Sequence, residues 1–156
     1  MTSPVSIPVG HELLAADFDP YENLTGVWQS YTPAWTSSGT APSLGNGTLT
    51  GAYFQAGKLV HVRTVLTMGS TTTFGTGTYR LSLPVGAKGD SLIDALCNDV
   101  SASLRWAGSA WIILQTAGGD NMRIIVAAGV GGVTEAAPFT WANGDRLVLA
   151  GSYEAA

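Results

Sequence analysis

The sequence predicts an all-β fold: an antiparallel β-sandwich of jelly-roll type, preceded by an extended N-terminal arm that contains a short helix. From Trp28 onward, short apolar segments recur about every ten residues and are separated by turns that contain glycine. Within the segments, apolar and polar residues alternate with a period of two, which is typical of a strand with one buried face. The sequence lacks the alternation of strand and helix segments that is typical of a parallel sheet.

Residues 1–27 differ from the rest of the chain. Pro4 and Pro8 disfavour helix and favour an extended segment. The apolar and acidic residues that follow predict one or two helical turns, with a second short turn from Tyr21 to Leu24. This segment is too short to bury its own apolar side chains, so it must pack on the main domain or on a neighbouring copy. We therefore divide the chain into an N-terminal arm, residues 1–27, and a β-domain, residues 28–156.

The strands are expected in order along the β-domain. They are Trp28–Thr36, Thr48–Ala56, Lys58–Met68, Gly77–Pro84, Ser101–Trp106, Ser109–Thr116, Asn121–Ala128 and Arg146–Tyr153. The pairs Ala107–Gly108 and Gly118–Gly119 are predicted to be turns. Ser91–Asp99 fits either a short helix or a strand, and its periodicity leaves both open.

Charge is scarce in this chain. Charged residues make up 12% of the sequence, about half the usual share, and the formal net charge is −4. The basic residues are scattered, whereas nucleic-acid binding requires a basic stripe, so we expect no nucleic-acid partner. No apolar run approaches the ~18 residues of a membrane span, so we expect no membrane insertion. A surface poor in charge tolerates close protein contact, which favours a permanent assembly.

No set of side chains typical of an enzyme stands out. His11 and His61 belong to no metal-binding or catalytic spacing, and Cys97 is expected to be a small buried apolar side chain. Most acids stand beside glycine, asparagine or serine, where hydrogen bonding within turns is their usual role. We expect no enzyme, no cofactor and no metal.

The five tryptophans are the remaining candidates for binding. Trp35, Trp106 and Trp111 are the residues that we single out, because exposed tryptophan on a β-sandwich often stacks against sugar rings. Packing in the core or at a subunit interface is the competing interpretation, since aromatic side chains are enriched in both. The sequence leaves the two interpretations open and favours packing.

The stretch GSTTTFGTG, Gly69–Gly77, carries no charge, no histidine and no acid. It lacks the lysine and the strand-to-helix context of a phosphate-binding loop. We interpret it as a structured connection between strands in which Phe74 packs inward.

Three segments of the chain carry motifs that are more specific than the rest. Residues Ser30–Pro84 contain the strings Tyr-Thr-Pro-x-Trp and Leu-Gly-Asn-Gly-Thr-Leu-Thr-Gly, and they resemble a β-rich module of virion proteins from tailed phages that infect actinobacteria. Residues Phe139–Ala156, which begin FTWANGD, are similar to the C-terminus of that module. GHELLAADFDPYENLTG in the arm is similar to a stretch that precedes β-domains in phage tail and fibre proteins. Residues 85–138 carry no comparable motif.

The resemblance implies a non-enzymatic structural protein of the phage particle. It would be made in the host cytoplasm and displayed on the virion surface as a homotrimer, either as a tail or baseplate appendage or as a capsid decoration protein. The arm would attach it to other virion proteins through apolar side chains, which are Leu13, Leu14, Phe18, Tyr21 and Leu24. The alternative is a module that binds carbohydrate on the host surface.

Overall fold

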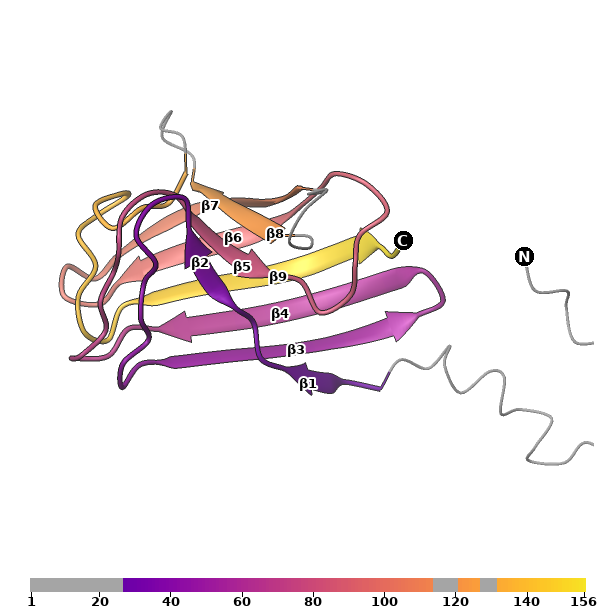
Figure 1. Cartoon of the computed structure of the whole chain (residues 1–156), viewed down its shortest axis with the longest axis horizontal. Helices are drawn as coiled ribbons and strands as arrows, with labels where there is room; N and C mark the ends of the chain where they lie inside the picture. The colour runs from indigo at the N-terminus through magenta and orange to yellow at the C-terminus, as the bar shows by residue number, and fades with distance from the viewer. Residues whose placement is uncertain (1–26, 114–120, 127–131) are drawn as a thin grey trace, which may run out of the picture.

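The strands form one antiparallel sheet. The computed structural model describes residues 27–113, 121–126 and 132–156, and within these ranges it contains nine strands and no helix (Figure 1). The strands are β1 (Gln29–Tyr31), β2 (Trp35–Ser37), β3 (Thr48–Ala56), β4 (Leu59–Thr67), β5 (Tyr79–Ser82), β6 (Ser91–Asp99), β7 (Leu104–Ile113), β8 (Asn121–Val126) and β9 (Arg146–Glu154). The expected arm and its short helix lie outside the described residues, apart from Val27.

The strand order is β1-β3-β4-β9-β6-β7-β8-β5-β2, and every neighbouring pair is antiparallel. The two edges, β1 and β2, are three residues long, which leaves little unpaired backbone for pairing with another chain. The all-β, antiparallel prediction is therefore confirmed.

The sheet curls so that its two edges approach each other. β1 and β2 stand at opposite ends of the strand order, yet only Thr32, Pro33 and Ala34 separate them along the chain. Such a short connection requires the two edges to lie close in space. In Figure 1, β2 and β5 accordingly cross in front of the layer of long strands. Because hydrogen bonds join all nine strands into one sheet, the expected two-sheet sandwich and its jelly-roll order are not confirmed.

The core lies on the inner face of the curled sheet. In β4 the buried residues are Val60, Val62, Thr64 and Leu66, which alternate with exposed or half-buried neighbours. β6, β7, β8 and β9 add buried apolar residues in the same way, whereas the one buried residue of β3 is Gly51. The fully buried large side chains are Tyr79, Leu66, Met68, Leu81, Ile112, Met122, Ile124, Leu147, Leu149, Val60, Val62 and Val133. The period of two in the sequence thus predicts the buried face correctly.

Three local expectations need correction or completion. The segment Trp28–Thr36 is two strands, because the chain leaves β1 at Thr32 and pairs again at the opposite edge of the sheet. Ala107–Gly108 is no turn but lies inside β7, where Gly108 pairs with Ala95 on one side and Val126 on the other. Ser91–Asp99 is a strand, which β7 and β9 both pair.

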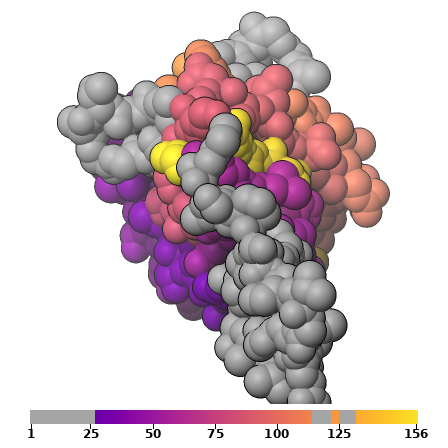
Figure 2. All heavy atoms as spheres, turned by 90° about the vertical axis from the view of Figure 1, so that its right-hand side faces the viewer, coloured from indigo at the N-terminus to yellow at the C-terminus, as the bar shows by residue number. Residues whose placement is uncertain are grey.

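The two ends of the sheet differ in what they carry. Val27 enters beside the β3–β4 turn, because Gln29 pairs with Tyr53. The C-terminal residues lie at this same end, where the backbone N–H of Ala155 donates to the carbonyl of Lys58. Figure 2 looks onto this end and shows the yellow C-terminal residues among magenta and pink residues from the middle of the chain. The opposite end carries the loops 38–47 and 68–78.

Candidate functional site

Hydrogen bonds join the threonine-rich stretch Gly69–Gly77 to the loop 38–47. Backbone hydrogen bonds join Ser43 and Thr73 in both directions at 2.9 Å, and the N–H of Thr76 donates to the carbonyl of Thr40 at 3.0 Å. The hydroxyl of Thr76 in turn accepts from the N–H of Thr40. Each loop therefore satisfies the backbone of the other.

Asn46 is the side chain that joins most groups across the two loops. Its Oδ1 accepts from the N–H of Thr71 at 2.9 Å and from the hydroxyl of Thr71 at 3.0 Å, and its Nδ2 donates to the hydroxyl of Ser70. The hydroxyl of Thr72, buried beneath, donates to the carbonyl of Leu44 at 2.6 Å. The hydroxyl groups of Thr71 and Thr72 are therefore already hydrogen-bonded within the protein.

Phe74 is half-buried and packs against the core cluster, as expected. The carbonyl of Phe74 accepts a hydrogen bond from the hydroxyl of buried Tyr79. Gly75 has φ +61°, and a Cβ there would collide with the carbonyl of Thr40, so only glycine fits this close approach. The interpretation of Gly69–Gly77 as a structured strand connection is confirmed.

Two of the three singled-out tryptophans serve packing. Trp106 stacks on Phe139 with ring centroids 4.7 Å apart, and it lies against the core. Trp35 meets Tyr79 edge-on at 5.1 Å, also against the core. Both rings are thus in contact with another aromatic ring, which agrees with a packing role.

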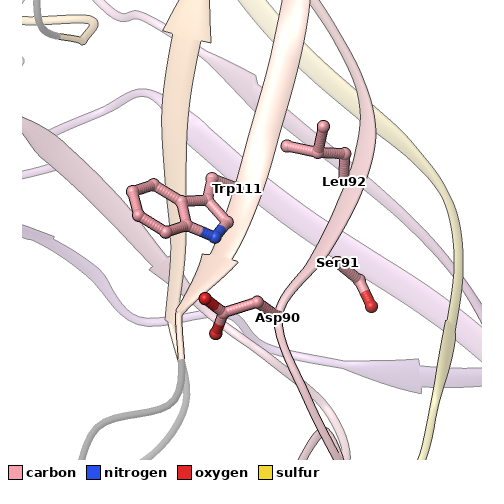
Figure 3. A pocket seen from close by; sticks show the side chains of 4 residues that line it. All are labelled: Asp90, Ser91, Leu92 and Trp111. Atoms are coloured by element: carbon pink, nitrogen blue, oxygen red, sulfur yellow. The ribbon is translucent and has the colours of Figure 1, made fainter.

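Trp111 is different, because it lines an open hollow on the outer face of the sheet. The hollow measures 460 Å³ and is lined by Asp90, Ser91, Leu92 and Trp111. Trp111 on β7 stands opposite Leu92 on β6, and Leu92 is 66% exposed. Figure 3 shows the carboxylate of Asp90 on the side of the indole nitrogen, with Leu92 and Ser91 beyond.

This arrangement offers an apolar ring face, a carboxylate and a hydroxyl within one concave surface. An indole face stacks against the C–H groups of a sugar ring, while carboxylate and hydroxyl groups bind sugar hydroxyls through hydrogen bonds. Of the three tryptophans, Trp111 is therefore the one with the surroundings of a binding site.

Several titratable groups have structural partners. His61 lies on the outer face of β4, where its Nδ1 is 2.8 Å from the hydroxyl of Ser152. Burial raises the pKa of the Cys97 thiol to about 12, which keeps it protonated. Hydrogen bonds from the N–H of Ala102 and the hydroxyl of Ser101 lower the pKa of Asp99, and the buried Asp145 accepts from the N–H groups of Val100 and Ala142. The expected turn chemistry of these acids is confirmed.

Further observations concern the described residues alone. Among them, no group of three or more His, Cys, Asp or Glu side chains is placed to hold a metal ion. No helix in the described ranges is long and apolar enough to cross a membrane. The residues expected to attach the arm, Leu13, Leu14, Phe18, Tyr21 and Leu24, lie outside the described part of the chain.

The sequence singles out Trp111 as a candidate but gives no sign of the residues around it. Asp90, Ser91 and Leu92 precede it by about twenty positions, and they meet it only through the register of β6 and β7. That register depends on the hairpin at residues 100–103, where Ser103 has φ 56°. The alternation of Leu92 with the buried Ile93 is the one signal that marks Leu92 as an outward apolar residue.

One comparison with known proteins found a similar protein, and that protein belongs to a phage tail. The chain is similar to the Mu-like prophage FluMu defective tail fiber protein of Haemophilus influenzae, with 32% identity over 127 residues. The matched region covers 80% of this chain but only 20% of that protein, so the chain spans about a fifth of its relative's length. No protein-family profile and no solved structure matches the chain. The similarity supports a phage tail structural module, whereas the actinobacterial host that the resemblance implied finds no support in this relative.

Proposed function

We propose that the chain is a non-enzymatic structural module of a phage tail, displayed on the virion as a homotrimer and attached to other virion proteins by residues 1–27. The similarity to part of a tail fiber protein is the observation that carries this proposal. It favours a tail location over capsid decoration, which the sequence left open.

The two ends of the sheet fit this role. Val27 and Ala156 lie at one end of the sheet, whereas the hydrogen-bonded loops 38–47 and 69–77 lie at the other end. An appendage held by its arm would thus present the loops outward. Their uncharged, mutually hydrogen-bonded residues suit an exterior surface that must resist proteolysis.

Deleting residues 1–24 tests the attachment. The truncated protein is expected to keep the β-structure and thermal transition of the full chain, because the described core contains no residue before Tyr31. It is expected to be missing from purified particles. An immunoblot of the particles measures this, and full-length protein supplied in the same way is the positive control. Normal incorporation of the truncation would refute attachment by the arm.

Carbohydrate binding is the second candidate function, and the Trp111 hollow favours it. A shallow site with one indole and one carboxylate is suited to a surface glycan bound through a single residue or terminal sugar. Trp111→Ala is expected to abolish binding of the purified protein to an array of bacterial surface glycans. Trp28→Ala is the matched control, because Trp28 is 48% exposed and does not line this hollow. Equal loss in both variants, or no binding by the parent protein, would refute a site at Trp111.

A further inference from the structure

Two arginines stand beside Trp111 on the outer face of the sheet. Arg123 on β8 pairs with Trp111 on β7, and Arg80 on β5 pairs with Arg123 in turn. Directly opposite residues of antiparallel strands project from the same face, with Cβ atoms about 5 Å apart. The chain neighbours Leu81 and Met122 are buried in the core, so this row points outward. We call Arg123 and Arg80 the arginine pair.

The arginine pair breaks a rule of sheet stability. Like charges directly opposite each other on neighbouring strands are destabilising. Both side chains are half-buried, so water screens the two charges only in part. Within the described ranges, the Nε of Arg80 is buried and has no hydrogen-bond partner. Because proteins break such local rules mostly at functional sites, the arginine pair is a candidate for binding an anion.

The side chain of Arg123 extends toward β5. Its Nε lies 3.5 Å from the place that a Cβ on Gly132 would take. Gly132 precedes Val133, whose backbone forms hydrogen bonds with both β8 and β5. Arg123 therefore reaches over the boundary between β8 and β5, on the side where Arg80 stands.

The acids near Trp111 lie on its other side. Asp90 directly precedes β6 and Asp94 belongs to it, and β6 and β8 flank β7 on opposite sides. Both aspartates are exposed, so water solvates their carboxylates and they need no further partner. Figure 3 shows Asp90 near the indole nitrogen of Trp111. The surface around Trp111 is thus negative toward β6 and positive toward β8 and β5.

We propose that the arginine pair binds the anionic group, a carboxylate or a phosphate, of a surface glycan whose sugar ring stacks on Trp111. This inference rests on the carbohydrate-binding function proposed above and deepens it by naming the class of glycan. A planar guanidinium suits this role, because it donates two parallel hydrogen bonds to one carboxylate or phosphate. Trp111 and Arg80 are about 10 Å apart by two strand spacings, so the anionic group belongs to the stacked sugar or to the next one.

The charges of the chain restrict both the ligand and its orientation. The formal net charge of −4 repels an extended polyanion, whose binding requires a basic stripe, whereas two arginines match a single anionic group. Asp90 and Asp94 would repel an anion placed toward β6, but a carboxylate there accepts hydrogen bonds from sugar hydroxyls. The glycan therefore lies across Trp111 with its anionic group toward β8 and β5.

An array of matched glycans tests the class of ligand. The full chain is applied to pairs that differ only in the anionic group: a uronic acid with the corresponding hexose, and a phosphorylated sugar with its dephosphorylated form. In at least one pair, the acidic member is expected to bind about tenfold more tightly or better, because charge-assisted hydrogen bonds are the stronger ones. The two kinds of pair distinguish a carboxylate from a phosphate. Equal binding within every pair would overturn the inference.

Substitution of Arg80 tests the residue. In calorimetric titrations with the acidic glycan that binds best, Arg80→Gln is expected to raise the Kd about tenfold, while the Kd of the neutral counterpart stays unchanged. Arg80→Lys keeps the charge without the planar fork, so its Kd should fall between the two. Arg105→Gln is the matched control, since Arg105 is exposed on the same face of β7, six residues or about 20 Å from Trp111.

A stability measurement separates binding from a structural role of Arg80. Without glycan, Arg80→Gln is expected to be at least as stable as the parent in thermal denaturation, because it removes one of two opposed like charges. A lower transition temperature than that of the parent would show that Arg80 supports the fold, and it would contradict the inference.

The outcomes separate this inference from the proposed function. Glycan binding that requires Trp111 but not Arg80, or a preference for neutral or amino sugars, would overturn the arginine pair as an anion site and leave carbohydrate binding intact. A parent protein that binds no glycan would contradict carbohydrate binding and the inference together. A preference for the acidic member that is lost in Arg80→Gln and kept in Arg105→Gln would support the inference.

Discussion

Tyr31 and Gly51 form a pair that fixes the β1 edge. The ring of Tyr31 lies directly on Gly51, which stands opposite it on β3, and its hydroxyl is 2.7 Å from that of the fully buried Thr64. Burial raises the pKa of Tyr31, and the hydrogen bond with Thr64 opposes that rise. A larger residue at position 51 would therefore collide with the ring of Tyr31.

Gly51→Ala is expected to destabilise the protein by about 1–3 kcal/mol, because the new Cβ collides with the ring and separates the Tyr31–Thr64 hydrogen bond. Chemical denaturation followed by tryptophan fluorescence measures it. Gly89→Ala is the control, since nothing lies within 4 Å of a Cβ there, and it should be near neutral. Equal stability of the two variants would contradict this account of Gly51.

Cys97 is expected to react with thiol reagents only when the protein unfolds. Its side chain is fully buried, and burial raises its pKa to about 12 from a usual value of 9.0. At pH 8, labelling by a disulfide reagent should follow the unfolding equilibrium, whereas denatured protein should react at once. Because the folded pKa is the higher one, this thiol's contribution to stability is complete below pH 9 and is lost as the pH rises toward 12. Rapid labelling of native protein at pH 8 would contradict this placement.

At the scale of elements, the loop pair 38–47 and 69–77 depends on Asn46. Asn46→Ala removes three side-chain hydrogen bonds to Ser70 and Thr71, so we expect a loss of about 1–2 kcal/mol and faster cleavage within 69–77. Limited proteolysis with mapping of the cut sites by mass spectrometry measures it. Asn143→Ala, at an exposed turn, is the control. Unchanged cleavage in Asn46→Ala would show that the backbone bonds between the loops suffice.

The elements also show what sequence alone can predict. The inward residues of β4 and β5 follow from alternation, because one buried face demands a period of two. The split of Trp28–Thr36 into β1 and β2 does not, since both halves look like strands and only the closure of the whole sheet sends them to opposite edges. Likewise, the neighbourhood of Trp111 cannot be predicted without the register of β6 and β7, because Asp90 and Leu92 are about twenty residues away along the chain.

For the whole molecule, the proposed homotrimer makes a direct prediction. Light scattering coupled to size-exclusion chromatography should give three times the 16.1 kDa of the chain. The low charge and the exposed apolar residues on one side, which include Leu92 and Leu59, provide the physical reason for association. A clean monomer would contradict the homotrimer and favour a monomeric binding module.

The short connection from β1 to β2 limits how far the two edges of the sheet can separate. The four peptide units from Tyr31 to Trp35 span at most about 14 Å when fully extended, and they tether one margin of the sheet to the other. Any widening of the curl beyond that reach must first strip one of the two short outer ladders. The curled sheet is therefore closed by the chain itself, and we expect it to open first at the three-residue pairing of β1 with β3 or of β2 with β5, while the long strands remain paired with one another.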